Sequence, residues 1–294
     1  MNKRTLSILF LAALTGFTLA QSTGRVINIK GGQVSGNPRN GPLEFSGDFT
    51  ATVQNLKIKG NIGVLTAPQG STLSESEGKR VASFEGGVVV TRGRLTAKGP
   101  SLEYKESTGL GVLAGPTNVV QKPEKAGEED VVITSATSTF DVDTDVSTSE
   151  GNVKLQNGKQ SGSSDKIVFD EKANLACLTG SKSVSLVREP KKEGQSKLTI
   201  VSKESRVLTE TNLLYAVGAV TLVSGNNSTT GDTLYYDDEK EIAYVSGRPA
   251  KNVNKKDGTV ISGSTIVNNT KLSQVKLGSA FAVPLEKFKC PSNK

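Results

Sequence analysis

The sequence predicts an all-β protein assembled from repeats, with almost no helix after the first twenty residues. Three observations predict this fold class. Three stretches of about thirty residues superpose without gaps, apolar and polar residues alternate within them, and Ser, Thr, Val and Gly dominate. No later stretch has the three-and-four apolar spacing of a helix. Repetition of this kind is typical of a stack in which each unit packs on its neighbours.

The first twenty residues have the pattern of a secretory signal peptide. Lys3 and Arg4 precede an apolar run from Leu6 to Leu14, and small residues lead up to Ala20. The run is too short to span a bilayer as a permanent helix, although a retained membrane anchor is the alternative interpretation. No later stretch is apolar enough to cross a bilayer. We therefore expect cleavage after Ala20 and a soluble product in the periplasm or cell envelope.

The three superposed stretches each begin and end on glycine, at Gly86 to Gly115, Gly151 to Gly180 and Gly218 to Gly247. In each stretch, apolar residues follow the first glycine by 2, 4, 16 and 18 positions. Residues two apart in a strand point to the same face of a sheet, so each pair is expected to face an apolar interior. The candidate interior residues are Val88, Val90, Leu102, Tyr104, Val153, Leu155, Ile167, Phe169, Val220, Leu222, Leu234 and Tyr236.

Glycines at corresponding positions extend the repeat over most of the chain. They are Gly47, Gly86, Gly115, Gly151, Gly180, Gly218 and Gly247. Their spacings alternate, so the unit is a pair of rungs, and seven rungs with two strands each predict roughly fourteen strands. Charged inserts at residues 121–130, 188–197 and 248–258 are expected to form exposed hairpin loops. We expect one continuous repeat-built domain over residues 21–280, followed by a C-terminal tail over residues 281–294.

The composition excludes most catalytic chemistry. The 294 residues include no His and no Trp, which removes His-based triads, His-ligated zinc and haem, and indole stacking platforms. Two Cys are too few for a Cys₄ zinc site, and the pairing of Cys177 with Cys290 is left open. The acidic run Asp237 to Glu239 has the residue types of a glycosidase carboxylate pair, but it reads better as a tight turn. We therefore expect no metal, no cofactor and no enzymatic activity, with a polysaccharide-processing β-helix enzyme as the alternative.

Two short motifs recur in the repeats, G-x-V-x-[VL] and D-x-[LI]-x-[YF]-D. The copies are Gly86–Val90, Gly151–Leu155 and Gly218–Leu222 for the first motif, and Asp165–Asp170 and Asp232–Asp237 for the second. The first unit departs from the second motif, with Pro100 and Lys105 in place of its aspartates. With these motifs, a secretory start and a Ser/Thr-rich composition, the chain resembles the OstA-like, LptA-type family over roughly residues 40 to 270.

The resemblance implies a fold, a cargo and a location. Members of the family resemble a folded-over antiparallel sheet, a β-taco or open β-jellyroll, with an apolar groove along its length, whereas the periodicity alone also permits a β-helix. They carry lipopolysaccharide across the periplasm. The chain resembles the soluble bridge component of that pathway most, because no barrel or anchor segment follows its signal peptide.

Two functions from different classes follow from these observations. In the first, the candidate interior residues line a groove for the acyl chains of lipopolysaccharide or a related envelope lipid. Strand edges then add head to tail to another copy or to a related transport protein, which forms a bridge toward the outer membrane. Basic loop residues contact anionic head groups; they are Lys191, Lys192, Lys251, Lys255 and Lys256.

In the second function, the interior is a closed core and the loop lysines are merely solvated. The chain is then a structural cell-envelope scaffold that binds other surface proteins through strand edges or loops. Nucleic acid is disfavoured as a partner of either form because of the signal peptide.

Overall fold

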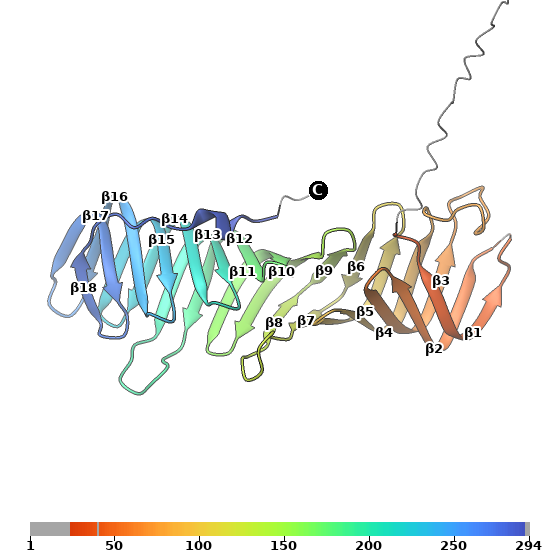
Figure 1. The fold of residues 1–294 in the computed structure, drawn as a ribbon, viewed down its shortest axis with the longest axis horizontal. Helices are drawn as coiled ribbons and strands as arrows, with labels where there is room; N and C mark the ends of the chain where they lie inside the picture. Colours follow the sequence, from red (N-terminus) through yellow and green to blue (C-terminus); the bar gives the residue numbers. More distant parts are fainter. Residues whose placement is uncertain (1–23, 40, 292–294) are drawn as a thin grey trace, which may run out of the picture.

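The structure is a computed structural model that describes residues 24–39 and 41–291. Within these residues, eighteen strands form one antiparallel sheet, and the molecule is elongated with β1 near one end and β18 near the other (Figure 1). The strands are β1 (Asn28–Gly36), β2 (Leu43–Val53), β3 (Leu56–Thr66), β4 (Val81–Arg92), β5 (Leu95–Lys105), β6 (Leu110–Ala114), β7 (Thr117–Gln121), β8 (Val131–Ser135), β9 (Thr137–Asp141), β10 (Val146–Asn157), β11 (Gln160–Asp170), β12 (Leu175–Arg188), β13 (Leu198–Leu208), β14 (Leu213–Ser224), β15 (Asn227–Asp237), β16 (Ile242–Asn254), β17 (Val260–Asn269) and β18 (Gln274–Leu277).

The predicted all-β fold of antiparallel strands is confirmed. The pairings among the described strands are antiparallel, which removes the β-helix alternative because its coils pair in parallel. The strand count is eighteen within the described residues, not fourteen, for two reasons. β1 and β18 add an edge strand at each end, and β6–β7 and β8–β9 are each one strand interrupted near Gly115 and Ala136. The predicted signal peptide lies outside the described residues.

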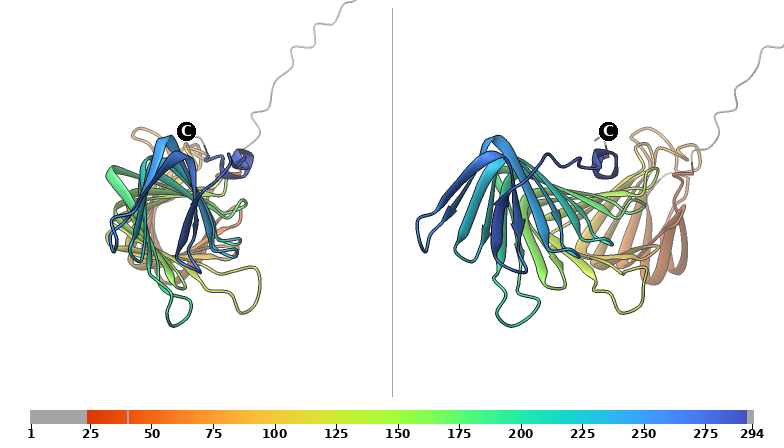
Figure 2. Two further views of the ribbon diagram at one scale, coloured as in Figure 1. Left: turned by 90° about the vertical axis from the view of Figure 1, so that its left-hand side faces the viewer. Right: turned by 60° about the vertical axis from the view of Figure 1, so that its left-hand side comes forward.

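The repeated glycines lie in the middle of strands, where the sheet bends. In β10 the pairing register shifts between Glu150 and Val153, and Gly151 between them has a φ of 83°. Gly218 has the same position in β14 as Gly151 has in β10, with a φ of 83° and a shift of the pairing register around it. A bulge with a left-handed glycine bends a strand and increases its twist. A line of such bulges folds the sheet along its length, so that its strands curl around the long axis in an end-on view (Figure 2).

The inner face of the folded sheet forms a continuous apolar core. Alternate residues of each strand are buried in it, as in β4, where Val88 and Val90 are inward and Val89 lies between them half-buried. The core extends from Ile27, just before β1, to Ile266 in β17. The apolar alternation of the repeats is therefore the inner face of the fold.

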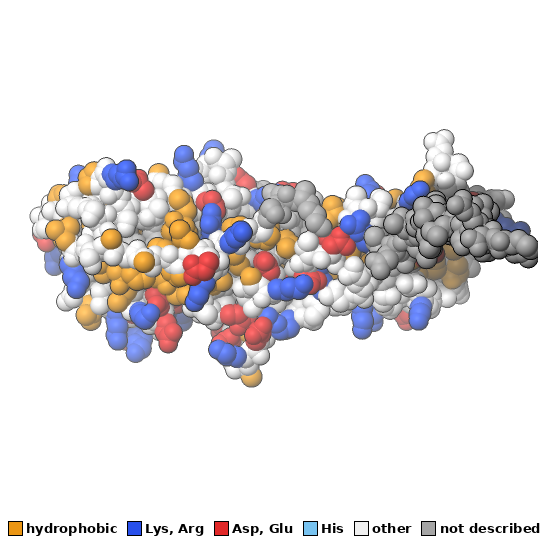
Figure 3. Space-filling view, turned by 45° about the horizontal axis from the view of Figure 1, so that its top comes forward, with side chains coloured by type: hydrophobic (Ala, Val, Ile, Leu, Met, Phe, Trp, Pro, Cys, Tyr) orange, Lys and Arg blue, Asp and Glu red, His pale blue; other side chains and the backbone are white. Residues whose placement is uncertain are grey.

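The C-terminal segment covers part of the outer face. After β18 the chain runs back along the molecule, the dark-blue trace of Figure 1, and forms a short 3₁₀ helix, η1 (Leu285–Phe288). Phe281 stacks on Tyr244 with ring centroids 4.2 Å apart, and Phe288 is fully buried beside Tyr235. We call residues 278–291 the strap. Figure 3 shows hydrophobic side chains gathered over this C-terminal half of the molecule.

A disulfide fixes the end of the strap to the sheet. Cys290 is bonded to Cys177 in β12, so the pairing that the sequence left open is present. Cys177 faces outward, into a second apolar cluster with Val168 and Tyr235 that is separate from the interior. In the described part of the chain, no helix has the length and apolar character needed to cross a membrane.

Candidate functional site

The turns at the two ends of the strands meet along one side of the molecule. The first row of turns comprises residues 66–81, 105–110, 141–146, 170–175, 208–213, 237–242 and 269–274. The second row comprises residues 53–56, 92–95, 121–131, 157–160, 188–198, 224–227 and 254–260. Side chains of one row contact residues of the other, and we call this line of contact the seam. The seam closes the interior on the side opposite the bends.

Two arginines of the second row hold the seam near the middle of the chain. Arg92, which is 2% exposed, forms an ion pair with Glu171 and donates to the carbonyl of Asp141 at 2.7 Å. Arg94 forms an ion pair with Glu210 at 3.1 Å. Burial raises the pKa of the Glu171 carboxyl, and the neighbouring Arg92 offsets part of that rise.

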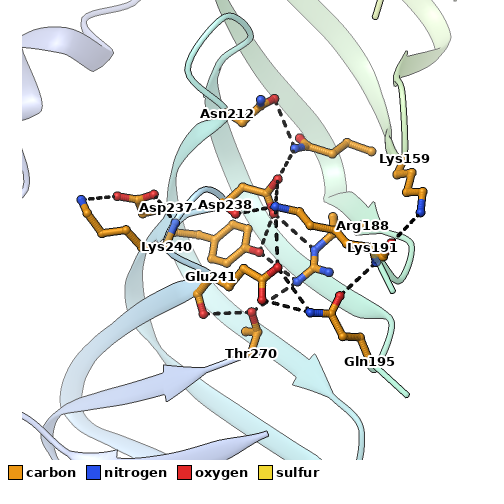
Figure 4. Close-up of polar contacts among 12 residues, drawn as sticks. Lys159, Arg188, Lys191, Gln195, Asn212, Asp237, Asp238, Lys240, Glu241 and Thr270 are labelled. Atoms are coloured by element: carbon orange, nitrogen blue, oxygen red, sulfur yellow. Dashed lines mark hydrogen bonds and ion pairs between the residues drawn. The ribbon is translucent and has the colours of Figure 1, made fainter. Parts of the chain in front are cut away.

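A larger polar cluster holds the seam in the C-terminal half (Figure 4). Asp238 of the first row lies at its centre, with one carboxylate oxygen 3.3 Å from Arg188 Nε and the other 3.0 Å from Lys191 Nζ. Gln160 donates to Asp238 at 3.1 Å and to Asn212 at 3.3 Å. Three residues of the second row thus converge on one carboxylate of the first.

Tyr236 and Thr270 connect this cluster to the apolar interior. Arg188 Nη2 donates to the Tyr236 hydroxyl at 3.1 Å and to Thr270 at 3.3 Å, and the tyrosine donates to Asp238 at 2.7 Å. Burial, together with the charge of Asp238, raises the pKa of Tyr236. The hydroxyl therefore stays protonated and keeps donating to Asp238 at any physiological pH.

Side chains, not backbone ladders, hold the seam. Among the described residues, no backbone–backbone hydrogen bond joins the first row to the second. The two halves of the sheet are continuous through their strands at the bends, but at the seam they are joined by ion pairs and amide contacts. Such contacts can separate without breaking any sheet pairing.

Two cavities adjoin at the Arg188 part of the seam. The outer cavity, which we call the vestibule, has a volume of about 360 Å³ and is lined by charged and amide side chains of both rows. The inner one, which we call the chamber, is lined mainly by Leu, Ile and Val side chains and has about 30 Å³ of free space, enough for roughly two water molecules. Gln160, Arg188 and Asn212 line both cavities. The interior beneath the seam is therefore nearly filled.

A family model described as the LptA/(LptD N-terminal domain) LPS transport protein matches residues 132–274. The family matched over these residues is thus LptA-type, and the match covers just under half of the chain. The matched residues run from β8 to β18 and include the Asp238 cluster, the chamber and most of the vestibule.

Comparison with known structures and curated proteins gave two further findings. The chain is similar to the solved structure of LptH from Pseudomonas aeruginosa, described as the LptA homologous periplasmic component of a lipopolysaccharide transport device. The identity is 11%, the match covers 45% of this chain and 92% of that one, and the TM-score is 0.37. No curated protein matches the chain.

All twelve candidate interior residues lie in the inner core. The most exposed of them, Leu155, is 4% exposed, and the others are buried more deeply. Leu155 and Tyr236 also line the chamber. The structure thus brings the twelve together on one apolar face, and their contact with a lipid stays a prediction.

The candidate head-group lysines are not brought together. Lys191 joins the Asp238 cluster, whereas Lys192 lies exposed in the same loop. Lys251, Lys255 and Lys256 lie exposed on β16 and in the turn after it. Lys191 is therefore the lysine of this set that lines the vestibule.

Sequence reasoning missed the arginines and amides of the seam. A signal for two of them was present, because Arg92 continues the inward-facing alternation of Val88 and Val90. Arg188 continues that of Val184 and Leu186 in the same way. A charged residue at a strand position whose side chain faces the interior indicates a buried ionic contact.

The beginning of the described chain is attached to the first row by Glu106. Its carboxylate is fully buried and accepts from the backbone N–H of Ile27 at 2.9 Å, from that of Gly78 at 2.8 Å, and from the Arg80 guanidinium at 2.6 Å. Burial alone would raise the pKa of Glu106, but these donors outweigh it and hold the pKa below its usual 4.5.

We expect Glu106→Gln to lower the free energy of unfolding by about 2–4 kcal/mol at neutral pH, because an amide cannot accept all these hydrogen bonds. A depressed carboxyl pKa stabilises the fold above the pKa of the unfolded chain and is lost as pH falls through the folded value. The deficit of the variant, measured by urea unfolding at pH 7.5 and at pH 3.5, should therefore shrink in acid. Glu103→Gln, at an exposed ion pair with Lys105, is the matched control and should have little effect. An equal deficit at both pH values would contradict this role.

Proposed function

We propose that the chain is a non-enzymatic periplasmic carrier that holds the acyl chains of lipopolysaccharide or a related envelope lipid between the two halves of its folded sheet. The observation that carries the proposal is a continuous apolar interior closed along one side by side-chain contacts alone. The match of residues 132–274 to the LptA-type family supports the cargo class and the periplasmic location. The twelve candidate interior residues are the proposed lipid path.

The filled interior determines how lipid would enter. Exposing a buried Leu, Val or Phe side chain costs about 1.5–3 kcal/mol, so an open interior is stable only when apolar chains replace the lost contacts. Opening at the seam and lipid insertion are therefore coupled. Head groups would remain outside, along the second row of turns, where Lys191 and Lys192 lie.

The two edges of the sheet support association in line. β1 is exposed along its length, and β18 covers less than half of β17, which leaves Val260 53% exposed. Unpaired strand edges add strands of another chain. We propose head-to-tail contacts, with another copy or a related transport protein, that would continue the apolar interior toward the outer membrane.

A scaffold is the second candidate, and the nearly filled chamber favours it. Mass spectrometry of organic extracts from the mature protein, purified gently from its native envelope, distinguishes the two candidates. A stoichiometric glycolipid or phospholipid is the result we expect of a carrier. A lipid-free protein that co-purifies with another surface protein would favour the scaffold.

A further inference from the structure

We propose that the seam at Arg188 is a lateral entry site for one anionic amphiphile, whose head group binds in the vestibule while its acyl chain enters the chamber. This inference rests on the proposed carrier function and deepens it. It assigns a place along the molecule where lipid enters, the residue that recognises the head group, and the chemical class of that head group.

Three buried polar atoms of two vestibule residues have no hydrogen-bond partner among the described residues. They are Nε and Nη1 of Arg188, whose side chain is 4% exposed, and Oε1 of Gln121, a residue that is 6% exposed. Arg188 Nε does lie 3.3 Å from Asp238 in an ion pair, whereas Nη1 and the Gln121 oxygen have no such contact. A buried polar group without a partner destabilises the fold, so such groups are rare without a reason. Both residues line the same 360 Å³ cavity. A ligand that accepts from Arg188 and donates a hydroxyl to Gln121 would satisfy both.

The unpartnered donor of Arg188 indicates an oxyanion as the ligand. Asp238 has Arg188 Nε on one side and Lys191 on the other, and Lys191 also lies 3.8 Å from Glu241, so two cations face two carboxylates and Nη1 points to none of them. Glu210 is matched by Arg94. Lys159 also lines the vestibule and donates to two loop carbonyls, of Pro190 and Lys191. A phosphate or carboxylate would therefore meet a guanidinium with both Nη1 hydrogens free, the donor geometry that suits such oxyanions.

The chamber directly beneath supplies the place for the acyl chain. The residues common to both cavities, Gln160, Arg188 and Asn212, form the floor of the vestibule and the roof of the chamber. The contact between Gln160 and Asn212, at 3.3 Å, crosses the seam at this point. Parting it joins a polar cavity to an apolar one. An amphiphile matches this arrangement because its head group can occupy the polar cavity and its acyl chain the apolar one. A free anion has no apolar part that would occupy the chamber.

Binding to the full mature protein, measured by isothermal titration calorimetry below the critical micelle concentration, tests the inference with three probes. They are a lysophosphatidic acid, a monoacylglycerol of the same chain length, and glycerol 3-phosphate. We expect lysophosphatidic acid to bind at least about tenfold more tightly than either other probe. Arg188→Gln should reduce its affinity to that of the monoacylglycerol, and Arg188→Lys should retain part of the preference.

Arg92→Gln is the matched control. Arg92 is an equally buried seam arginine, but its guanidinium is occupied by Glu171 and the Asp141 carbonyl, and it does not line the vestibule. This variant should keep the preference for lysophosphatidic acid, with any cost to folding recorded by thermal unfolding.

The outcomes separate the inference from the function on which it rests. If the monoacylglycerol binds as tightly as lysophosphatidic acid, or Arg188→Gln retains the preference, the entry site is wrong while lipid binding stands. Equally tight binding of glycerol 3-phosphate would identify a free-anion site and overturn entry of an amphiphile. If neither lysophosphatidic acid nor the monoacylglycerol binds, the proposed entry site at Arg188 is wrong. The carrier itself is judged separately, by the lipid extracted from the native envelope.

Discussion

Removal of the disulfide in the double variant Cys177→Ser/Cys290→Ser is expected to lower the free energy of unfolding by about 3 kcal/mol, because the bond restricts a long loop of the unfolded chain. The two cysteines are separated by 113 residues, and the strap that the bond secures includes the buried Phe288. Loss of the bond should also loosen the strap from Tyr235 and Tyr244, against which Phe281 stacks. Urea unfolding of the wild type and the variant, both without reductant, measures the first effect.

Lipid binding is the control for this prediction. The strap packs on the outer face, in a cluster with Val168 and Cys177 that is separate from the interior. The variant should therefore bind the same amount of lipid as the wild type at a temperature where both are folded. Unchanged stability would show that the strap does not contribute to the fold, and loss of lipid binding would place the strap on the lipid path.

Arg92→Met is expected to lower the free energy of unfolding by about 3–5 kcal/mol, because it leaves Glu171 buried at the seam without its cation. The side chains of the two residues are 1% and 10% exposed. The pKa of Glu171 is already raised by burial, and removal of Arg92 should raise it further. A raised carboxyl pKa stabilises the fold below the pKa of the unfolded chain, and this contribution is lost as pH rises through the folded value. The deficit should therefore be larger at pH 8 than at pH 5.

The double variant Arg92→Met/Glu171→Leu separates a lost ion pair from lost packing. Replacing both partners by apolar residues removes the uncompensated charge, so the double variant should recover most of the stability. A double variant as unstable as Arg92→Met would contradict the assignment of the deficit to Glu171. Chemical denaturation of the two variants in parallel measures the difference.

The sequence predicts the apolar interior of this fold better than the side-chain contacts that close it along the seam. The spacing of Val88 and Val90, and of Ile167 and Phe169, indicates which side chains face the interior. Residues two apart in a strand point to the same face of the sheet, wherever the strand lies in the fold. The same residues are buried in one core in the structure. The spacing identifies the repeated glycines, but it does not place them at bends rather than between strands, since a turn and a bulge both favour glycine.

The seam is harder to predict because its contacts join residues far apart in the chain. Arg188 lies 82 residues from Thr270 and 50 from Asp238, and the partner depends on the twist of the whole sheet. The acidic run at Asp237 predicts a turn on local grounds, and Asp237 itself does pair locally, with Lys240. Its neighbour Asp238 instead crosses the seam. The strap was missed for the same reason, because its partners are outward-facing side chains such as Tyr244.

Site-specific photocrosslinking in the native envelope tests the central claim, that lipid passes through the interior of the folded sheet. The photoreactive residue p-benzoylphenylalanine would replace Phe169, which is 1% exposed and faces the interior, and, in a separate variant, Lys166, which lies on the opposite face of β11. We predict a lipid adduct, detected by mass spectrometry, at position 169 and none at position 166. An absence of adduct at position 169 in a folded variant, or equal adducts at both positions, would contradict the account.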